Sequence, residues 1–228
     1  MDFSKIYSPR PANVHKGAYG NVLVVAGSKL YSGSSALAGV AAVRAGADLV
    51  TVIAVERAAN IAASHLPDLI TYPLTGSYLT ARHITDILDI AHVRKINSAV
   101  IGCGLGLHTA TMAAVLKLIQ KLTVPLVIDA DGLRAICSNP ASVFGKQAVL
   151  TPHLGELAIL MGVAKLNDDF ETRLSVAKQA AVKFRSTVLL KGSVDIATDG
   201  TTTITNNSGT PYMTKGGFGD TLSGIIGP

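Results

Sequence analysis

The segment Met213–Ile226 has the residue types and spacing that phosphoryl transfer requires. Gly216, Gly217 and Gly219 would let the chain turn sharply and leave bare N–H groups, and the helix predicted to follow adds partial positive charge at its N-terminus. Such an anion hole would hold a phosphoryl group. Asp220 would lie beside it as a carboxylate, placed to take a proton from an attacking hydroxyl. Capping of the helix by Asp220 is the structural alternative.

A second reactive group lies in the stretch Thr151–Glu156. His153 and Glu156 are three residues apart at a predicted helix start, so they share one face. A carboxylate beside a polyphosphate can hold Mg²⁺ directly or through water, and an imidazole can donate to a substrate. Helix capping with Glu156 in the first turn is the alternative. Asp129 and Asp131 could also orient metal-bound water, although we favour a capping role for Asp131.

Glycine-rich loops follow two more predicted strands. The loop Gly27–Ser35 could hold an anion, with Ser34 at the helix start, but a turn capped by a serine explains it equally well. It is not a Walker A loop, because Lys29 precedes the final glycine. Gly104 and Gly106 lie in a second loop that lacks the Rossmann spacing, which argues against a nicotinamide oxidoreductase. Either a close ligand or a tight turn accounts for those glycines.

Lys191 ends an apolar predicted strand and precedes a glycine. Its ammonium group would project over the same edge of the sheet as a phosphate partner. A solvated lysine at a strand end is the alternative.

Short β-branched runs alternate with helix-compatible segments along the chain. We expect strands at Val22–Ala26, Leu49–Val55, Ala99–Ile101, Leu126–Ile128, Ala148–Leu150 and Val188–Leu190. We expect helices at Ser34–Ala45, Thr80–Lys95, Thr109–Leu122 and Asp168–Arg185. Asp199-Gly200, between β-prone pieces at Val194–Thr198 and Thr201–Thr205, predicts a small antiparallel hairpin. The pattern predicts an α/β fold with a mostly parallel sheet and helices on both faces.

The glycine-rich and polar loops each follow a predicted strand directly. In open α/β sheets ligands bind at the carboxyl ends of the strands. We therefore expect these loops to line one crevice, which the loop before Asp220 could close. No repeat or linker divides the chain, so we expect one domain over residues 1–228.

The composition narrows the class of protein further. The 228 residues are 48% apolar and carry a formal net charge of +5 without a long basic run, and aromatic residues make up 5%. This favours a small anionic ligand over a nucleic acid. Two cysteines without metal or disulfide spacing indicate reduced thiols, and no apolar signal or membrane segment is apparent, so we expect a cytoplasmic protein.

Seven motifs occur in a fixed order: His15-Lys-Gly-Ala-Tyr-Gly20, Arg44-Ala-Gly-Ala-Asp-Leu-Val50, Gly102-Cys-Gly-Leu-Gly106, Asp129-Ala-Asp131, Thr151-Pro-His-Leu-Gly-Glu156, Lys191-Gly192 and Gly216-Gly-Phe-Gly-Asp220. In this order they resemble the ADP-dependent NAD(P)H-hydrate dehydratases, a ribokinase-like family. The resemblance covers nearly the whole chain from His15 onward. The pairing of Thr151-Pro-His-Leu-Gly-Glu156 with Gly216-Gly-Phe-Gly-Asp220 favours catalysis over capping for Asp220.

The resemblance implies that the protein dehydrates (S)-NAD(P)H hydrate. It implies ADP or ATP as the co-substrate and Mg²⁺ as a cofactor. It also implies a homo-oligomer, a tetramer in this family. Contacts to the hydrate are implied for Ser34, Gly104, Gly106, His153 and Asp220, and contacts to the nucleotide for Lys191, Gly192, Ser193, Val194, Asp195 and Gly219. Asp220 would be the base, and its place at a helix start should keep it ionised.

The sequence departs from the family at three places. Cys103 replaces the usual proline between two glycines, and Phe218 replaces a small residue or threonine. The chain also stops at Pro228, where family members continue, so we expect a domain truncated at its C-terminal end. Two other functions stay open: a small-molecule kinase of the same fold, and a nucleotide-binding module without turnover.

Overall fold

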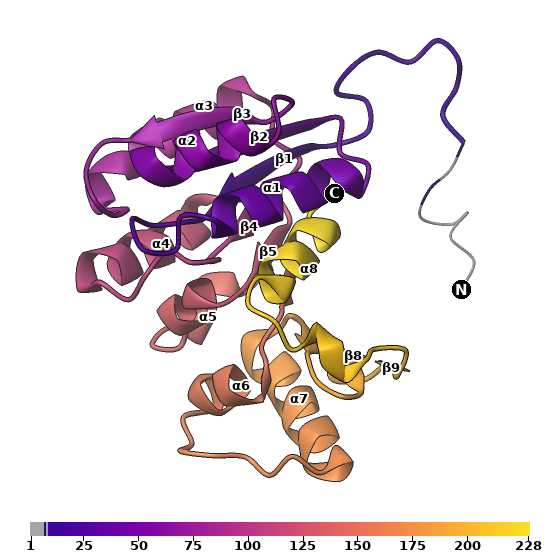
Figure 1. Cartoon of the computed structure of the whole chain (residues 1–228). Coiled ribbons are helices and arrows are strands. Elements are labelled where there is room, and N and C mark those ends of the chain that lie inside the picture. The colour runs from indigo at the N-terminus through magenta and orange to yellow at the C-terminus, as the bar shows by residue number, and fades with distance from the viewer. Residues whose placement is uncertain (1–6, 8) are drawn as a thin grey trace.

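The computed structural model describes Tyr7 and residues 9–228. Within them nine strands form one sheet in the order β3-β2-β1-β4-β5-β6-β7-β8-β9 (Figure 1). Neighbouring strands from β3 to β7 pair in parallel, whereas β7, β8 and β9 pair antiparallel. The strands are β1 Asn21–Val25, β2 Leu49–Val55, β3 Ile70–Leu74, β4 Ser98–Ile101, β5 Leu126–Ile128, β6 Ala148–Leu150, β7 Thr187–Leu190, β8 Asp195–Thr198 and β9 Thr203–Asn206.

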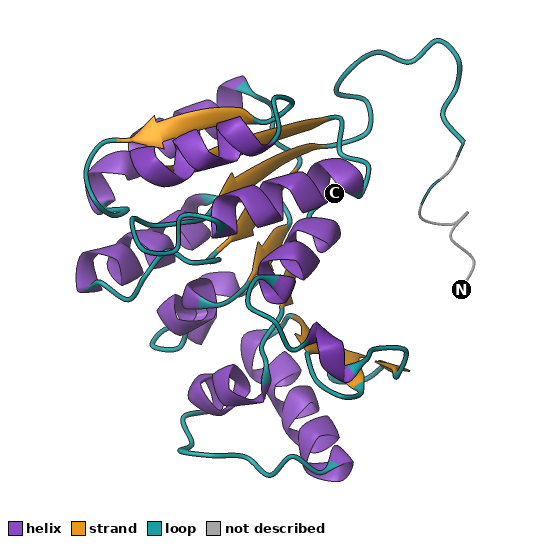
Figure 2. Ribbon diagram, viewed as in Figure 1, coloured by secondary structure: helices purple, strands orange, loops and turns teal. Residues whose placement is uncertain are grey.

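Helices lie on both faces of this sheet (Figure 2). The α-helices are α1 Ser34–Arg44, α2 Glu56–His65, α3 Ile84–Val93, α4 Thr109–Lys121, α5 Asp131–Ile136, α6 Leu154–Met161, α7 Phe170–Phe184 and α8 Phe218–Ile226. Short 3₁₀ turns are η2 Ala81–His83, η3 Pro140–Val143 and η4 Pro211–Met213.

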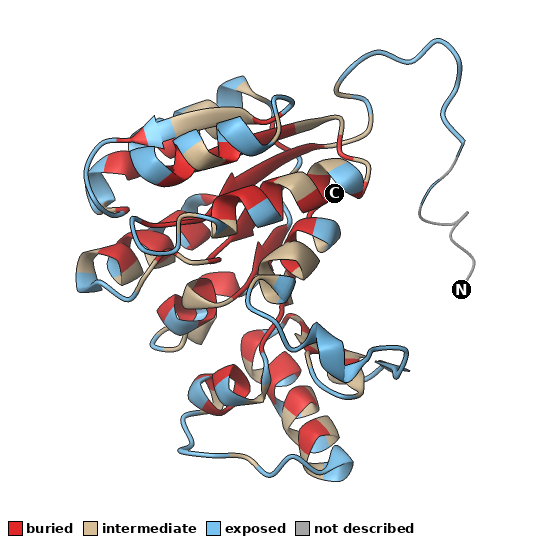
Figure 3. Ribbon diagram, viewed as in Figure 1, coloured by how far each residue is buried: buried red, intermediate tan, exposed pale blue. Residues whose placement is uncertain are grey.

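The two faces of the sheet build two apolar cores, because successive side chains of a strand point to opposite sides. Val22 and Val24 of β1 pack toward α1, α2 and α8. Leu23 and Val25 pack toward the helices α3 to α7. Figure 3 shows the strands buried between the two helix layers. A sheet covered on both faces explains why its strands are apolar throughout.

The expected α/β fold, with its mostly parallel sheet and antiparallel hairpin, is confirmed. The sequence patterns missed strand β3 and helix α2. β3 contains Pro73 and forms the edge of the sheet, where a missing backbone N–H is tolerated. α2 follows β2 without an intervening turn residue. The helix expected from Thr80 instead starts as the η2 turn and becomes α-helical at Ile84.

The two motifs nearest the N-terminus, His15–Gly20 and Arg44–Val50, are joined by hydrogen bonds. The carboxylate of Asp48 accepts hydrogen bonds from the backbone N–H groups of Gly17 and Tyr19, each at 3.0 Å, and pairs with Arg10 at 2.6 Å. These bonds lower the pKa of Asp48, the Tyr19 N–H having the largest effect. The Asp48 carboxylate therefore fixes the segment that leads into β1.

Helix α8, which carries Asp220, packs directly against α1 (Figure 1). The contact is close because Gly224 has no side chain. A methyl group added at Gly224 would lie 2.2 Å from the carbonyl oxygen of Ala38 and 2.8 Å from Cβ of Ala41. The position of α8 on the sheet therefore depends on glycine at residue 224.

We predict that Gly224→Ala destabilises the protein by about 1–3 kcal/mol, the usual cost of overpacking a core. The control is Gly216→Ala, because a methyl group there meets nothing within 4 Å. Urea unfolding monitored by circular dichroism measures both. Equal midpoints for the two variants would show that α8 does not depend on this close contact.

Candidate active site

The strand order reverses at β1, which lies between β2 and β4. The loops after β1 and β4 therefore meet at a topological switch point, where ligands commonly bind in open α/β sheets. The N–H of Gly27 donates to the carbonyl of Cys103 at 2.7 Å. A methyl group on Gly104 would lie 2.5 Å from Oγ of Ser34, so glycine permits this approach. Two loops far apart in sequence thus share one edge.

The loop after β5 joins the same edge through another close contact. Gly102 has a φ of +127°, and a methyl group there would lie 1.9 Å from the carbonyl oxygen of Asp129. Ala130, next in the chain, has φ +48° and ψ −116°, a strained conformation for a residue with a side chain. Strain of this kind persists where surrounding contacts fix the backbone, and it occurs here directly beside Asp129.

Asp129 forms a buried ion pair with Lys191. The two groups lie 2.8 Å apart, Asp129 is 1% exposed, and the same carboxylate oxygen accepts from the hydroxyl of Thr151 at 2.8 Å. A methyl group on Gly219 would lie 3.3 Å from the ammonium nitrogen of Lys191. The alternative of a solvated lysine is therefore wrong, because Lys191 is held between the end of β5 and the start of α8.

His153 and Glu156 form a capping box at the start of α6. Nδ1 of His153 accepts from the N–H groups of Gly155 and Glu156, while the Glu156 carboxylate accepts from the N–H of His153 at 2.8 Å. The capping arrangement considered for this motif is therefore present. Glu156 also lies 3.9 Å from Lys191, and the His153 side chain is 60% exposed, which leaves its outer face open to a ligand.

The glycine loop before Asp220 has the form of an anion hole. Gly217 has a φ of +92° and is the N-cap of α8, without a capping side chain. Within the described part of the chain, the N–H groups of Gly216, Gly217 and Gly219 have no hydrogen-bond acceptor. Free donors at a helix N-terminus favour an anion there.

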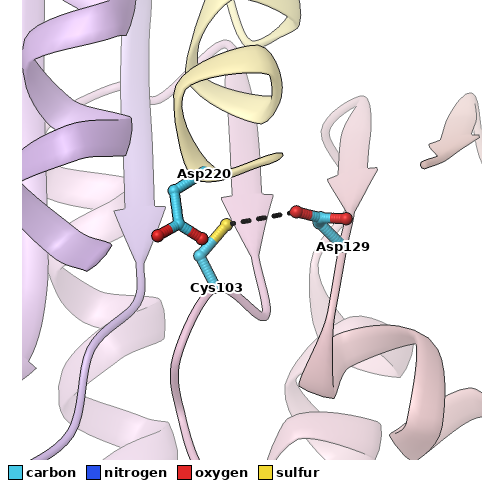
Figure 4. A group of neighbouring side chains, drawn as sticks. All are labelled: Cys103, Asp129 and Asp220. Carbon is cyan, nitrogen blue, oxygen red and sulfur yellow. Dashed lines mark hydrogen bonds between the residues drawn. The ribbon is translucent and has the colours of Figure 1, made fainter. Parts of the chain in front are cut away.

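Asp220 lies in the first turn of α8, and Figure 4 shows it beside Cys103, which follows β4, and Asp129, which follows β5. Its carboxylate, that of Asp129 and the thiol of Cys103 have ligand-type atoms within 4.8 Å of one another. The Ser34 hydroxyl lowers the pKa of Asp220 as a polar neighbour of its carboxyl group. Ser34 does not cap α1, whose N-cap is Gly33 without a side-chain bond.

The surroundings of Asp220 raise its pKa. Burial is the main cause, and the charge of Asp129 adds to it; hydrogen bonds from Ser34 and Cys103 and the charge of Lys191 act in the opposite direction. We expected the helix start to favour the carboxylate and keep Asp220 ionised but weakly basic. Burial instead raises its pKa, which makes the carboxylate a stronger base than an exposed aspartate.

Asp131 does not have the capping role that the sequence favoured. The N-cap of α5 is Ala130, and Asp131 is the first residue of the helix. Its carboxylate accepts from the N–H of Gly106 at 2.7 Å, which ties the loop after β4 to α5. The N–H of Gly106 is thus already engaged. Any contact of Gly106 with a substrate would use other atoms of that residue.

The predicted nucleotide loop, residues 191–195, leaves the site toward the hairpin. Its start is joined to α6 by a parallel bridge between Lys191 and His153. The N–H of Gly192 donates to the Asp195 carboxylate at 3.0 Å, and the carbonyl of Val194 accepts from Arg173 at 2.8 Å. Contacts among described residues thus bring the loops bearing Ser34, Gly104, His153, Lys191 and Asp220 to one edge of the sheet.

Two residues at this edge, Cys103 and Arg173, were not assigned a role by sequence reasoning. Asp129 was considered as a residue that orients metal-bound water, but its pairing with Lys191 was not predicted. Cys103 is fully buried, and burial together with Asp129 and Asp220 raises the pKa of its thiol well above the usual value, so the thiol stays protonated.

Mg²⁺ requires oxygen ligands and often keeps several waters. Glu156 offers a carboxylate, but one oxygen accepts from the N–H of His153 and the other lies 3.6 Å from its Nε2. Glu156 therefore fits a cation through a water molecule better than by a direct bond. The protonated thiol of Cys103 is a poor Mg²⁺ ligand.

Comparisons with known proteins agree with this geometry. A sequence model of the NAD(P)H-hydrate dehydratase family matches residues 22–228. The chain belongs to this family. It is 38% identical to the ADP-dependent (S)-NAD(P)H-hydrate dehydratase of Nitrosopumilus maritimus, over 97% of this chain and 76% of that protein.

The chain is also 38% identical to the bifunctional NAD(P)H-hydrate repair enzyme Nnr of Methanothermobacter thermautotrophicus, over 98% of its own length. It spans 43% of that longer protein. An ADP/ATP-dependent NAD(P)H-hydrate dehydratase from Bacillus subtilis, co-crystallised with ATP and Mg²⁺, has a similar structure. The TM-score is 0.77 and the identity 26%, with 96% of this chain and 74% of that chain covered.

The expected ribokinase-like fold is confirmed. The structure resembles that of a ribokinase-like superfamily protein from Enterococcus faecalis, with a TM-score of 0.78 and 24% identity. Among the described helices, none has the length and apolar character needed to cross a membrane.

The raised pKa of Asp220 predicts a pH-dependent effect on stability. A carboxyl whose pKa is higher in the folded chain than in the unfolded chain binds more protons when folded, so stability falls as the pH rises through that interval. Above that interval the ionised Asp220 opposes folding. We predict that Asp220→Asn raises the melting temperature at pH 7 and that the gain shrinks on acidification.

Asp48→Asn is the matched control of opposite sign, because the pKa of Asp48 is lowered. The ionised Asp48 stabilises the folded chain at neutral pH, and this contribution is lost as the pH falls through its folded pKa. Its substitution should lower the melting temperature at pH 7. Thermal melts across a pH series measure both variants, and a lower melting temperature for Asp220→Asn at pH 7 would contradict the burial argument.

Proposed function

We propose that this protein dehydrates (S)-NAD(P)H hydrate to NAD(P)H and converts ADP to AMP and phosphate in the same reaction. The observation that carries the proposal is the position of Asp220. Its half-buried carboxylate follows three glycines whose N–H groups have no acceptor within the described chain, and Gly219 lies against Lys191. A base thus adjoins an anion hole and a cation, which is what phosphoryl transfer to a hydroxyl needs.

The chemistry follows from the poor leaving ability of water. Asp220 accepts the proton of the hydroxyl on the hydrated ring while that oxygen attacks the terminal phosphorus of ADP, and AMP departs. The new phosphate ester is a good leaving group. The electron pair of the ring nitrogen then expels phosphate, and loss of a proton from the neighbouring carbon restores the double bond. Hydrate and ADP therefore yield NAD(P)H, AMP and phosphate.

Each neighbour of Asp220 has a place in this scheme. The N–H groups of Gly216, Gly217 and Gly219 would stabilise negative charge on the transferred phosphoryl group. Lys191 would add a positive charge at the same place. Ser34 would donate to the Asp220 carboxylate and hold it toward the hydroxyl, since its own hydroxyl is among the groups that lower the pKa of Asp220.

The hydrate contacts proposed for Gly104, Gly106 and His153 fall on the same edge of the sheet. The nucleotide contacts proposed for Lys191, Gly192, Ser193, Val194 and Asp195 continue along the loop that leads away from it. This arrangement supports an in-line approach of the two substrates, with the transferred group between them.

Mg²⁺, when bound, would neutralise charge on the diphosphate. Glu156 would hold it through water, with phosphate oxygens as its remaining ligands. The turnover assay described below can be run with ATP in place of ADP. It can also be run with the hydrates of NADH and NADPH separately, which measures the preference between them.

We predict that Asp220→Asn lowers turnover at least about 100-fold, the low end of the contribution of a general base, while ADP still binds. Purified protein is incubated with the hydrate and ADP, and NAD(P)H, AMP and phosphate are quantified. The control is Asp89→Asn, which changes an exposed aspartate on α3. Unchanged turnover in Asp220→Asn would remove Asp220 from the role of base.

The same assay separates the other two functions. A stable phosphate ester in place of free phosphate would favour a kinase of the same fold. Binding of ADP without any product in the wild-type protein would favour a nucleotide-binding module.

We also propose a cytoplasmic homo-oligomer, a tetramer as the family resemblance implies, without a nucleic-acid or membrane partner. An apolar groove between α1 and α8 supports an interface between copies, since Leu37 and Ile225 line it and are 42% and 49% exposed. We predict a sedimentation mass that is a multiple of the monomer mass. A purely monomeric species at micromolar concentration would contradict this assignment.

A further inference from the structure

Arg173 is a buried charged residue without a well-placed carboxylate. It lies in the first turns of α7 and is 2% exposed. Its nearest acid is Asp168, 3.6 Å from Nε, and the Asp168 side chain is 78% exposed. Nε has no hydrogen-bond acceptor among the described residues. Burial of a guanidinium group is costly unless its donors are used, so the contacts it does make indicate its role.

Those contacts go to the loop after β7. One terminal nitrogen of Arg173 donates to the carbonyl of Val194 at 2.8 Å, and the other lies 3.4 Å from the hydroxyl of Ser193. A methyl group added to Gly192 would lie 2.0 Å from a terminal nitrogen of the same guanidinium group. The backbone conformation of Gly192 is not in the left-handed region. Glycine is therefore needed at residue 192 for space, because the guanidinium group occupies the place of a side chain.

This contact sets which groups the loop can offer to a ligand. The Val194 carbonyl and the Ser193 hydroxyl are engaged by Arg173, and the N–H of Gly192 is engaged by the Asp195 carboxylate. The N–H groups of Ser193 and Val194 have no acceptor within the described residues. Two consecutive free N–H groups over a positively charged guanidinium group favour an anion such as a phosphate.

We propose that Arg173 is the positioning residue of the nucleotide-binding loop: its planar fork holds Gly192, Ser193 and Val194 in the conformation that receives the diphosphate. The inference rests on the proposed function for the identity of the ligand. Lysine cannot replace this residue fully, because a single ammonium group does not provide the two donors of a planar fork. Arg173 itself acts through the loop and is not required to touch the nucleotide.

The test is a double-mutant cycle on ADP binding, measured by isothermal titration calorimetry with the full chain. Arg173→Ala and Gly192→Ala should each raise the Kd for ADP about tenfold or more, because each separates the loop from its support. In the double variant the added methyl group meets no guanidinium group. Gly192→Ala should therefore cost much less in the Arg173→Ala background than in the wild type.

The control variant is Lys183→Met, on the same helix, which removes a bond from Nζ to the carbonyl of Leu160 at 2.7 Å and leaves the loop untouched. It should lower the melting temperature without changing the Kd for ADP. Arg173→Lys should recover only part of the lost affinity. In steady-state assays the Arg173 variants should raise KM for ADP far more than KM for the hydrate or kcat, a split that general loss of stability does not produce.

The outcomes separate the inference from the proposed function. Wild-type affinity for ADP in Arg173→Ala, full recovery by Arg173→Lys, or equal costs of Gly192→Ala in both backgrounds would overturn the positioning role. ADP binding by the wild type without turnover of the hydrate would overturn the proposed function alone. Absence of ADP binding by the wild type would overturn both.

Discussion

The ion pair between Lys191 and Asp129 is the interaction on which the geometry of the site depends. It joins the ends of β5 and β7 across β6, at 2.8 Å and largely out of solvent. A buried pair of this kind contributes little net stability, but loss of either partner leaves a buried charge. In this site the pair fixes the positions of both groups. The ammonium group stays beside Gly219, where a transferred phosphoryl group would carry its charge. The carboxylate stays beside Asp220.

The second constraint is the balance of charges around Asp220. Two carboxylates and one ammonium group meet in a half-buried space, and the neutral thiol of Cys103 lies between the acids. The thiol donates to Asp129 at 3.8 Å and lies beside Asp220, so it separates like charges without adding one. A side chain without a donor at residue 103 could not make this bond. Cys103 therefore contributes to the electrostatic environment that sets the basicity of Asp220.

Much of the fold follows from local patterns, and the reason is physical. A parallel sheet covered on both faces requires apolar strands, and the runs at Leu49–Val55 and Leu126–Ile128 are strands with those bounds. The β3 strand was not predicted because Pro73 is unfavourable in any strand except one at the edge of a sheet. Which strand forms the edge is known only once the sheet is assembled. The expected position of the reactive loops followed from strand ends in the same way. Arg173 acts through contacts with residues at least 19 positions away in the sequence, and Cys103 through contacts with residues at least 26 positions away. Spacing along the chain does not encode contacts of this kind.

Helix α8 carries the proposed base at its first turn and the close contact with α1 at Gly224, one turn further on. Because α8 is short, a displacement of one end of the helix also moves its other end. A larger residue at Ala38 or Ala41 would thus displace the Asp220 carboxylate relative to Ser34. The packing of α8 and the reactivity of the proposed base are therefore coupled through the same few small residues.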